Sequence, residues 1–240
     1  MSPARNNPET RPAISVVVPV LNEAHRLDPL VDHLRQTAGD EPVEILIVDG
    51  SADGESIRTV TRGDVTLLSA PAGRARQMNA GASAAGGDAL IFLHADTRLP
   101  PGAFRLIAKT LSDGRYAAGA FDLRYDSERP LVRFIARVAC LRSRLTRIPY
   151  GDQAHFFRRD YFEALGGFAD IPFLEDVEIM RRIKGRGERI SILPDPVVTS
   201  ARRQEQEGVV FCTARNGAIV ALYVLGVSPG RLARFYREHR

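Results

Sequence analysis

Acidic side chains that could bind a cation or accept a proton stand at the ends of several apolar stretches. Asp49 ends the apolar run that starts at Val43, and Asp53 follows in a Gly-containing turn. Asp96 comes shortly after another apolar run, 89–93. A carboxylate can bind Mg²⁺ or Mn²⁺, or take a proton from a hydroxyl group. The spacing therefore indicates a site for an anionic or hydroxyl-bearing substrate.

Two further acids, Glu175 and Asp176, begin a stretch in which Val177, Ile179 and Met180 have helical spacing. Acids in the first turn of a helix are stabilised by the helix dipole, so capping is one explanation for this pair. The other is general-base chemistry, which needs a carboxylate within hydrogen-bond reach of an acceptor hydroxyl.

Polar residues near the same apolar runs could bind a nucleotide. Asn22 and Glu23 follow the first apolar run of the chain, residues 14–20, and Asn22 could instead cap a helix. Arg74 lies in a Gly-led segment and could donate charge-assisted hydrogen bonds to phosphates, or lie on a solvated face. Asn79 is polar within an Ala-rich helix and is positioned to face a cleft, and Asp152 with its neighbours could contact a sugar hydroxyl.

The elements that must position these residues follow from apolar periodicity. Continuous apolar runs predict buried strands, and three-to-four spacing predicts helices. The first half is expected to contain strands at 14–20, 43–49, 65–68 and 89–93, with helices at 22–37 and 73–85. The second half is expected to contain a strand at 117–125, a basic amphipathic helix at 131–144, a strand entering a helix within 151–165, a helix at 173–184 and a short strand at 190–193. Alternating strands and helices predict an α/β fold with a mainly parallel sheet, which binds ligands at the carboxyl ends of its strands.

Size and composition set limits on the function. The chain has 240 residues, a net charge of +4 and a pI of about 9.4. This excess suits an anionic substrate but is too small to indicate nucleic acid. Cys140 and Cys212 belong to no metal-binding motif, so a cytoplasmic location is expected. Residues 1–12 are predicted to be a disordered lead-in without the apolar segment of a signal peptide.

Taken together, the motifs resemble glycosyltransferase family 2. The resemblance rests on four segments, in order: Pro19-Val20-Leu21-Asn22-Glu23, Asp49-Gly50-Ser51-Ala52-Asp53-Gly54, Leu93-His94-Ala95-Asp96 and Leu174-Glu175-Asp176. It covers about residues 14–200. The segments 73–81, 94–100 and 199–203 are similar to a bacterial subgroup often labelled as associated with arsenosugar biosynthesis or radical-SAM/selenodomain genes.

The resemblance implies a GT-A-like, Rossmann-like catalytic domain and an inverting transfer of sugar from a nucleotide-diphosphate donor, UDP favoured, to a hydroxyl acceptor. It implies that Asp96 binds the divalent cation, Mn²⁺ or Mg²⁺, and that Asp176 is the general base, supported by Glu175. In the family's first acidic position this sequence has His94, which favours Mn²⁺ if it is a ligand. It implies donor contacts from these residues: Pro19, Asn22, Glu23, Asp49, Asp53, Arg74, Asn79, His94 and Ala95. Asp152, Gln153 and Arg181 are expected to contact the acceptor or the donor sugar.

Two alternative functions stay open. A nucleotidyltransferase shares this type of sheet, although its Gly-rich loop after the first strand is absent, and a non-catalytic sugar-nucleotide-binding protein would bind the donor without consuming it.

The catalytic domain is expected to span residues 13–203, and 204–240 is expected to form a helical tail broken around 227–230. The tail is apolar and basic, so it could contact a membrane surface peripherally, form a homodimer, or pack on the core. Arg202 and Arg203 are expected in a mobile loop that could close over the diphosphate.

Overall fold

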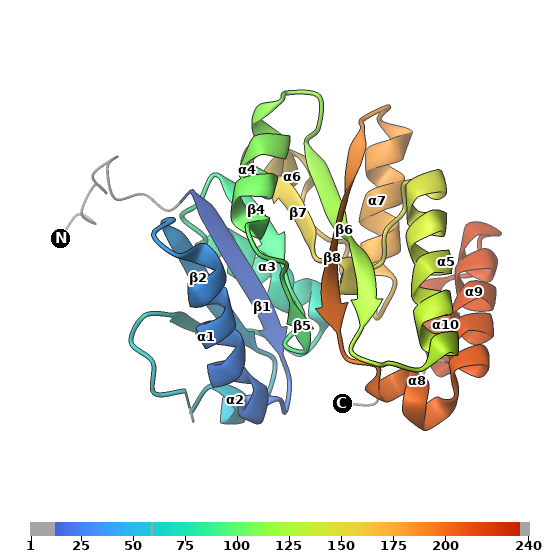
Figure 1. Cartoon of the computed structure of the whole chain (residues 1–240), viewed down its shortest axis with the longest axis horizontal. Coiled ribbons are helices and arrows are strands. Elements are labelled where there is room, and N and C mark those ends of the chain that lie inside the picture. Colours follow the sequence, from blue (N-terminus) through green and yellow to red (C-terminus); the bar gives the residue numbers. More distant parts are fainter. Residues whose placement is uncertain (1–12, 59, 236–240) are drawn as a thin grey trace.

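The computed structural model describes residues 13–58 and 60–235. The predicted lead-in, 1–12, lies outside the described residues. The eight strands are β1 (Ile14–Val20), β2 (Val43–Asp49), β3 (Thr66–Ser69), β4 (Ala89–Phe92), β5 (Thr97–Arg98), β6 (Ala118–Tyr125), β7 (His155–Arg158) and β8 (Ile190–Thr199). They form one sheet in the order β3-β2-β1-β4-β7-β6-β8-β5 (Figure 1). This is the predicted α/β, GT-A-like architecture.

The first half of the sheet is parallel, as predicted. β1 pairs with β2 on one side and β4 on the other, and β3 pairs with β2. β1 is buried along its whole length, which explains why its sequence is apolar on both faces. The carboxyl ends of β1 and β4 therefore lie next to each other at one edge of the sheet.

The second half is mixed. β7 is antiparallel to both β4 and β6, whereas β6 and β8 are parallel and β5 is antiparallel to β8. β8 continues to Thr199, well beyond the predicted end at 193. Its register with β6 shifts between Phe121 and Asp122, opposite Pro194 and Asp195. Because proline donates no backbone hydrogen bond, it interrupts the ladder and hides the strand in the sequence.

Helices cover both faces of this sheet. The helices are α1 (Leu27–Ala38), α2 (Glu55–Arg58), α3 (Arg74–Ala84), α4 (Ala103–Ser112), α5 (Pro130–Thr146), α6 (Arg159–Leu165), α7 (Glu175–Gly185), α8 (Arg202–Glu207), α9 (Val209–Val224) and α10 (Pro229–Leu232), with 3-10 turns η2 (Ala24–Arg26), η3 (Gly151–Gln153) and η4 (Ala233–Phe235). α1 and α4 pack on one face through side chains such as Leu34 and Phe104, and α3, α6 and α7 pack on the other through Met78, Phe162 and Met180. α4 was not predicted.

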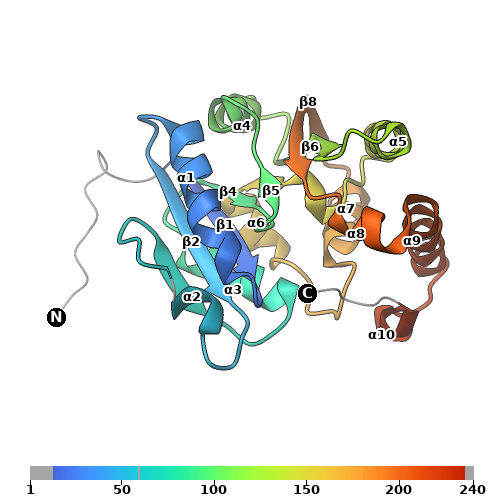
Figure 2. The ribbon, with the colours of Figure 1, turned by 60° about the horizontal axis from the view of Figure 1, so that its bottom comes forward.

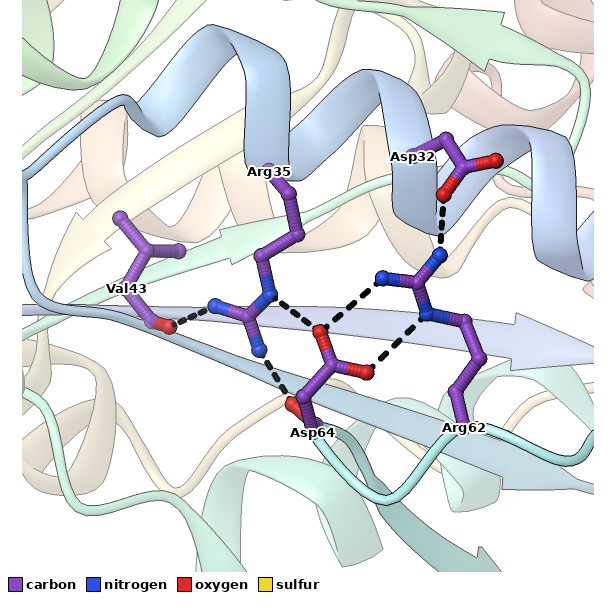
Figure 3. Close-up of polar contacts among 5 residues, drawn as sticks. All are labelled: Asp32, Arg35, Val43, Arg62 and Asp64. Carbon is purple, nitrogen blue, oxygen red and sulfur yellow. Dashed lines mark hydrogen bonds and ion pairs between the residues drawn. The ribbon is translucent and has the colours of Figure 1, made fainter.

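An arginine and aspartate network fixes the approach to β3 at the amino end of the parallel strands (Figure 3). Asp64 accepts hydrogen bonds from Arg35 Nε at 2.9 Å and Arg62 Nε at 3.0 Å. Arg35 also donates to the carbonyl of Val43 at 2.7 Å, and Arg62 donates to Asp32. The hydrogen bonds from Arg62 lower the pKa of Asp64 to about 2. The network tethers the loop before β3 to α1 and β2, away from the carboxyl ends.

The C-terminal helices pack beside the second half of the sheet, against α5 and α7 (Figures 1 and 2). Ile219 of α9 and Leu232 of α10 are buried with Leu174 and Val177. Arg202 and Arg203 begin α8, so the prediction of a loop there was wrong, and the predicted domain boundary at 203 falls inside this helix. In the part of the chain that the structure describes, no helix has the length and apolar content needed to cross a bilayer.

Candidate active site

A cavity of about 370 Å³ lies at the carboxyl ends of β1 and β4 and extends between α5, α8 and α9. The sheet side contributes residues that directly follow strands, because polar ends of neighbouring parallel strands meet there. The other side is formed by η3, by the first turn of α7 and by the C-terminal helices. The sequence-predicted site residues that line the cavity are Pro19, Glu23, Arg74, His94, Ala95, Asp96, Asp152, Gln153, Glu175 and Asp176.

Asp96 lies in the cavity wall after β4. Its Oδ1 is 3.4 Å from the hydroxyl of Thr97 and 3.5 Å from that of Thr199, the two residues that pair β5 with β8. Its Oδ2 is 3.7 Å from Nη1 of Arg26, and 27% of the side chain is exposed. The carboxylate is therefore positioned by the sheet but still open to a ligand.

Asp176 lies in the wall of the same cavity, in the first turn of α7. Its Oδ1 accepts a hydrogen bond from the backbone N–H of Val177 at 2.7 Å, and its Oδ2 accepts one from Gly151 at 2.7 Å. A Cβ at residue 151 would lie 3.3 Å from Nε2 of His94 and 3.4 Å from Oδ2 of Asp176. Glycine at this position thus lets η3 approach both side chains, and two N–H donors fix the direction of the carboxylate.

Left-handed backbone conformations flank the acidic residues. Asn22 (φ 57°) precedes Glu23, Ala154 (φ 50°) follows η3, and Leu174 (φ 69°) precedes Glu175. Such conformations are costly for residues other than glycine. Glu175 itself is buried, 3.9 Å from Nη1 of Arg74.

Buried polar atoms line the part of the cavity between η3 and the C-terminal helices. Among the described residues, Asp152 Oδ1, Arg142 Nη2, Gln204 Oε1 and Asn216 Oδ1 are buried without a hydrogen-bond partner. Buried polar groups are normally paired, so these four atoms indicate a binding site for a polar ligand. The guanidinium of Arg142 lies 3.4 Å from the ring centre of Tyr150, which holds it in place.

Burial has the largest effect on the one carboxyl in this region whose pKa is clearly raised. Burial, followed by the negative charges of Asp176 and Asp96, raises the pKa of Asp152 to about 6, while Arg142 opposes the shift. A carboxyl that titrates near neutrality in a cavity is a common feature of functional sites.

Two of the acids that were expected to contact the donor, Asp49 and Asp53, do not line the cavity. Asp49 is fully buried at the end of β2, where its carboxylate accepts hydrogen bonds from Ser51 N and Oγ at 2.8 Å each and from Ser56 N at 2.9 Å. Asp53 is exposed and caps the backbone N–H of Glu55 at 3.2 Å. Both side chains hold the turn before α2.

Three other predicted residues also lie outside it. Asn22 does not cap α1, which begins at Leu27 after η2; its backbone N–H donates to Ser56 Oγ instead. Asn79 uses both amide atoms on the backbone of Phe168, at 2.8 and 2.9 Å. Arg181 lies 5.2 Å from the ring centre of Tyr223. Local packing thus occupies the side chains of Asn79 and Arg181, whose types alone suggested ligand contacts.

Gln153 and Gln77 line the cavity but are occupied internally. The Gln153 amide donates to Phe121 O at 2.8 Å and Ser143 Oγ at 3.1 Å and accepts from Tyr150 N at 3.2 Å. Gln77 donates to the carbonyls of Val20 at 2.7 Å and Val48 at 2.9 Å, and so joins the ends of β1 and β2. Their role is to hold the cavity wall.

Sequence reasoning missed Arg142, Gln204 and Asn216. Arg142 is one of several arginines in a basic amphipathic helix, and Gln204 lies in a charged stretch that looked like a boundary. Of these three residues, only Asn216 could have been recognised from the sequence, because it is a polar residue in the middle of an apolar helix.

Comparison with known protein families agrees with this geometry. Residues 15–168, more than half of the chain, match the family model described as Glycosyl transferase family 2. The chain is a member of glycosyl transferase family 2. The matched segment contains β1 to β7 and therefore the sheet side of the cavity. Among curated proteins, none matches the chain.

Members of glycosyl transferase family 2 generally depend on a divalent cation, so we asked whether the cavity fits one. Within residues 13–58 and 60–235, no group of three or more His, Cys, Asp or Glu side chains is arranged to hold a metal ion. Asp96 nevertheless offers an open carboxylate oxygen, and its charge acts together with that of Asp176 on Asp152. This arrangement fits a cation bound to one protein carboxylate and to oxygen atoms of a substrate.

Proposed function

We propose that this family 2 glycosyltransferase transfers a sugar from a nucleotide-diphosphate donor to a hydroxyl acceptor with inversion, using Asp176 as general base and a divalent cation, Mn²⁺ or Mg²⁺, bound through Asp96. UDP is the favoured nucleotide. One observation carries the proposal: Asp96 and Asp176, 80 residues apart in sequence, line a single cavity.

The sheet side of the cavity is the proposed donor site. Pro19, Glu23, His94 and Ala95 lie at the strand ends that contact nucleosides in this type of fold. Arg74 lies at the start of α3, where its charge and the helix N-terminus both favour phosphate. Arg202 and Arg203, at the start of α8, supply further positive charge in the cavity wall. Nucleoside contacts by Asp49, Asp53 and Asn79 would require movement of side chains that are now engaged elsewhere, and a contact by Asn22 would come from a residue outside the cavity wall.

In the proposed reaction the acceptor hydroxyl gives its proton to Asp176 as its oxygen bonds to the anomeric carbon. The bond from that carbon to the diphosphate oxygen breaks, and the nucleotide diphosphate leaves with the electron pair. The bound cation supplies charge neutralisation for the leaving diphosphate. The N–H groups of Val177 and Gly151 hold the Asp176 carboxylate in one orientation, which keeps its reach to the acceptor constant.

The other side of the cavity is the proposed acceptor site. Arg142, Asp152, Gln204 and Asn216 present buried polar atoms that no described protein group satisfies, and hydroxyl groups of an acceptor would pair with them. Glu175 contributes negative charge next to the base, and Arg181 belongs to this proposal only as a support of Tyr223.

Asp176→Asn tests the proposal. The variant is expected to bind UDP with Mn²⁺ as the native protein does in calorimetry, and to lose transfer by about 10²–10⁴-fold, because amide oxygen cannot take the proton. Asp170→Asn, at an exposed position outside the cavity, is the matched control and should keep full activity. Normal turnover by Asp176→Asn would refute the assignment.

Calorimetry with a panel of nucleotides, followed by a donor-hydrolysis assay with and without Mn²⁺, distinguishes the two alternatives. A nucleotidyltransferase would consume a nucleoside triphosphate and release pyrophosphate. A non-catalytic sugar-nucleotide-binding protein would bind the donor and release nothing. Asp96 and Asp176 argue against a non-catalytic protein, and the absence of a Gly-rich loop after the first strand argues against a nucleotidyltransferase.

Membership of the arsenosugar or radical-SAM-associated subgroup stays a proposal and names no substrate. A cytoplasmic location is likewise proposed, and it is supported by the two cysteines, which are both free thiols. Homodimerisation and membrane contact through the C-terminal helices depend on the side chains that those helices expose.

A further inference from the structure

The outer surfaces of α5 and α9 are unusually apolar. In the described part of the chain, every exposed large apolar side chain lies on α5, on α9 or the residue after it, or on η4. Those of α5 are Leu131, Phe134, Val138, Leu141 and Leu145; the others are Val210, Phe211, Leu222, Val224, Leu225 and Phe235. Exposure reaches 76% at Leu145 and 80% at Leu225. A concentration of this kind marks an interaction surface.

The apolar side chains of α5 form one stripe. Their spacing of three and four residues places them on a single side of the helix, while Val132, Ala136 and Ser143 face the core. Val138 belongs to the stripe and also lines the cavity, so the stripe borders the proposed active site. We call this stripe and the exposed side of α9 the apolar face.

α9 contributes a second, broader surface. Its inward residues Val209, Cys212 and Ile219 are buried, whereas the outward positions carry apolar or small side chains throughout. Arg215 is the one charged residue within α9, and it pairs with Glu207. α9 packs next to α5, and Figures 1 and 2 both show the two helices together at the end of the molecule opposite α1. The exposed positions of α9 carry no polar or charged side chain.

The charged side chains within the helices of the apolar face are positive, and three of these arginines pair with acids just outside the helices: Arg133 with Glu128, Arg144 with Asp122 and Arg215 with Glu207. The segment 129–147 contains six arginines and no acidic residue, and 208–235 contains three arginines and no acidic residue. A second copy of this chain on the apolar face would bring like charges together, which opposes association. An anionic lipid surface would be attracted to the same arginines and would accept the apolar side chains.

We propose that α5 and α9 dock this protein on an anionic phospholipid bilayer, with the apolar face in the interface and the arginines at the level of the lipid headgroups. The helices lie in the plane of the interface and do not cross it. This inference is independent of the proposed reaction, since it rests on the exposed side chains of α5 and α9, most of which lie outside the cavity.

Vesicle flotation with the full chain tests the proposal. Vesicles of phosphatidylcholine with 30% phosphatidylglycerol are the probe, and vesicles of phosphatidylcholine alone are the neutral comparison. Binding is expected to the anionic vesicles and to weaken in 1 M salt, because salt screens the arginines. The double variant Phe211→Asp/Leu225→Asp should weaken binding by roughly tenfold or more, since charges on the apolar face oppose insertion.

The control is Gln36→Asp/Ala108→Asp, which adds the same charge at exposed positions on α1 and α4 and should bind as the native protein does. Phe211→Ser/Leu225→Ser gives the same test without added charge. Arg129→Gln and Arg137→Gln should each weaken binding by about fivefold. Equal binding to both kinds of vesicle, or no binding to the anionic kind, would overturn the proposal. So would a stable dimer in light scattering that Phe211→Asp/Leu225→Asp dissociates.

Discussion

Replacing Asp152 with asparagine should stabilise the fold in a pH-dependent way. The pKa of Asp152 in the folded protein is raised to about 6 from an ordinary value of 3.8, chiefly by burial. The unfolded chain therefore releases this proton at lower pH than the folded protein does. Stability linked to Asp152 is fully present below pH 3.8 and is lost as the pH rises through about 6.

The size of the effect follows from the shift. A difference of about two pKa units, at about 1.4 kcal/mol each, gives about 3 kcal/mol. Asparagine does not titrate, so the free energy of unfolding of Asp152→Asn minus that of the native protein should grow by about 3 kcal/mol between pH 4 and pH 7. Above pH 7 the difference should stay constant, because Asp152 is then ionised in both states.

Urea unfolding at half-unit steps from pH 4 to pH 8 measures this difference directly. Any constant cost of the asparagine itself cancels, since only the change with pH is compared. Asp195→Asn, at an exposed position, controls for the loss of one negative charge. A flat difference across the range would mean that Asp152 is not held in an unfavourable environment, and the reasoning would fail. Transferase activity should fall in the same variant if Asp152 contacts the acceptor, so stability and function would move in opposite directions.

Four other outcomes are expected. Asp96→Asn should abolish the effect of Mn²⁺ on UDP binding in calorimetry, because the proposed cation ligand is lost. Arg26→Gln should lower the Mn²⁺ concentration needed for half-maximal UDP binding, since its guanidinium, 3.7 Å from Asp96, competes with the cation; an increase would contradict this. Gln77→Leu should lower the free energy of unfolding by about 1–3 kcal/mol through the loss of hydrogen bonds to Val20 and Val48, as urea titration would detect. Gly119→Ala should lower it by about 1–3 kcal/mol or more, because its Cβ would lie 2.3 Å from the ring of Phe156; an unchanged melting temperature would mean that the ring can move freely.

The parallel half of the fold was predictable because its central strands are nearly continuous apolar runs. β1 and β2 were predicted to the residue, since most of their residues are apolar and buried. The second half was harder. β8 contains two prolines that break both the hydrogen-bond ladder and the sequence pattern, and Gly151 to Gln153 form a 3-10 turn where a strand was expected.

The candidate site was predictable to the extent that its residues follow strands or begin helices. Asp96 and Asp176 come from such positions and line the same cavity. Asp49 also lies at the end of a strand, but its carboxylate accepts hydrogen bonds from Ser51 and Ser56. That orientation depends on the local turn and not on the residue type. On the acceptor side only Asp152 was predicted, since Arg142, Gln204 and Asn216 meet only through the tertiary packing of three helices.

The left-handed residues around the cavity have a consequence for evolution and redesign. A side chain at Asn22, Ala154 or Leu174 costs about 1–2 kcal/mol that glycine would avoid, and β-branched residues would cost more. Ala154 and Leu174 are also buried, so neither larger nor smaller residues fit without loss. A library that diversifies the cavity to change sugar preference should therefore keep these three positions fixed and vary the side chains between them, where the backbone imposes no such restriction.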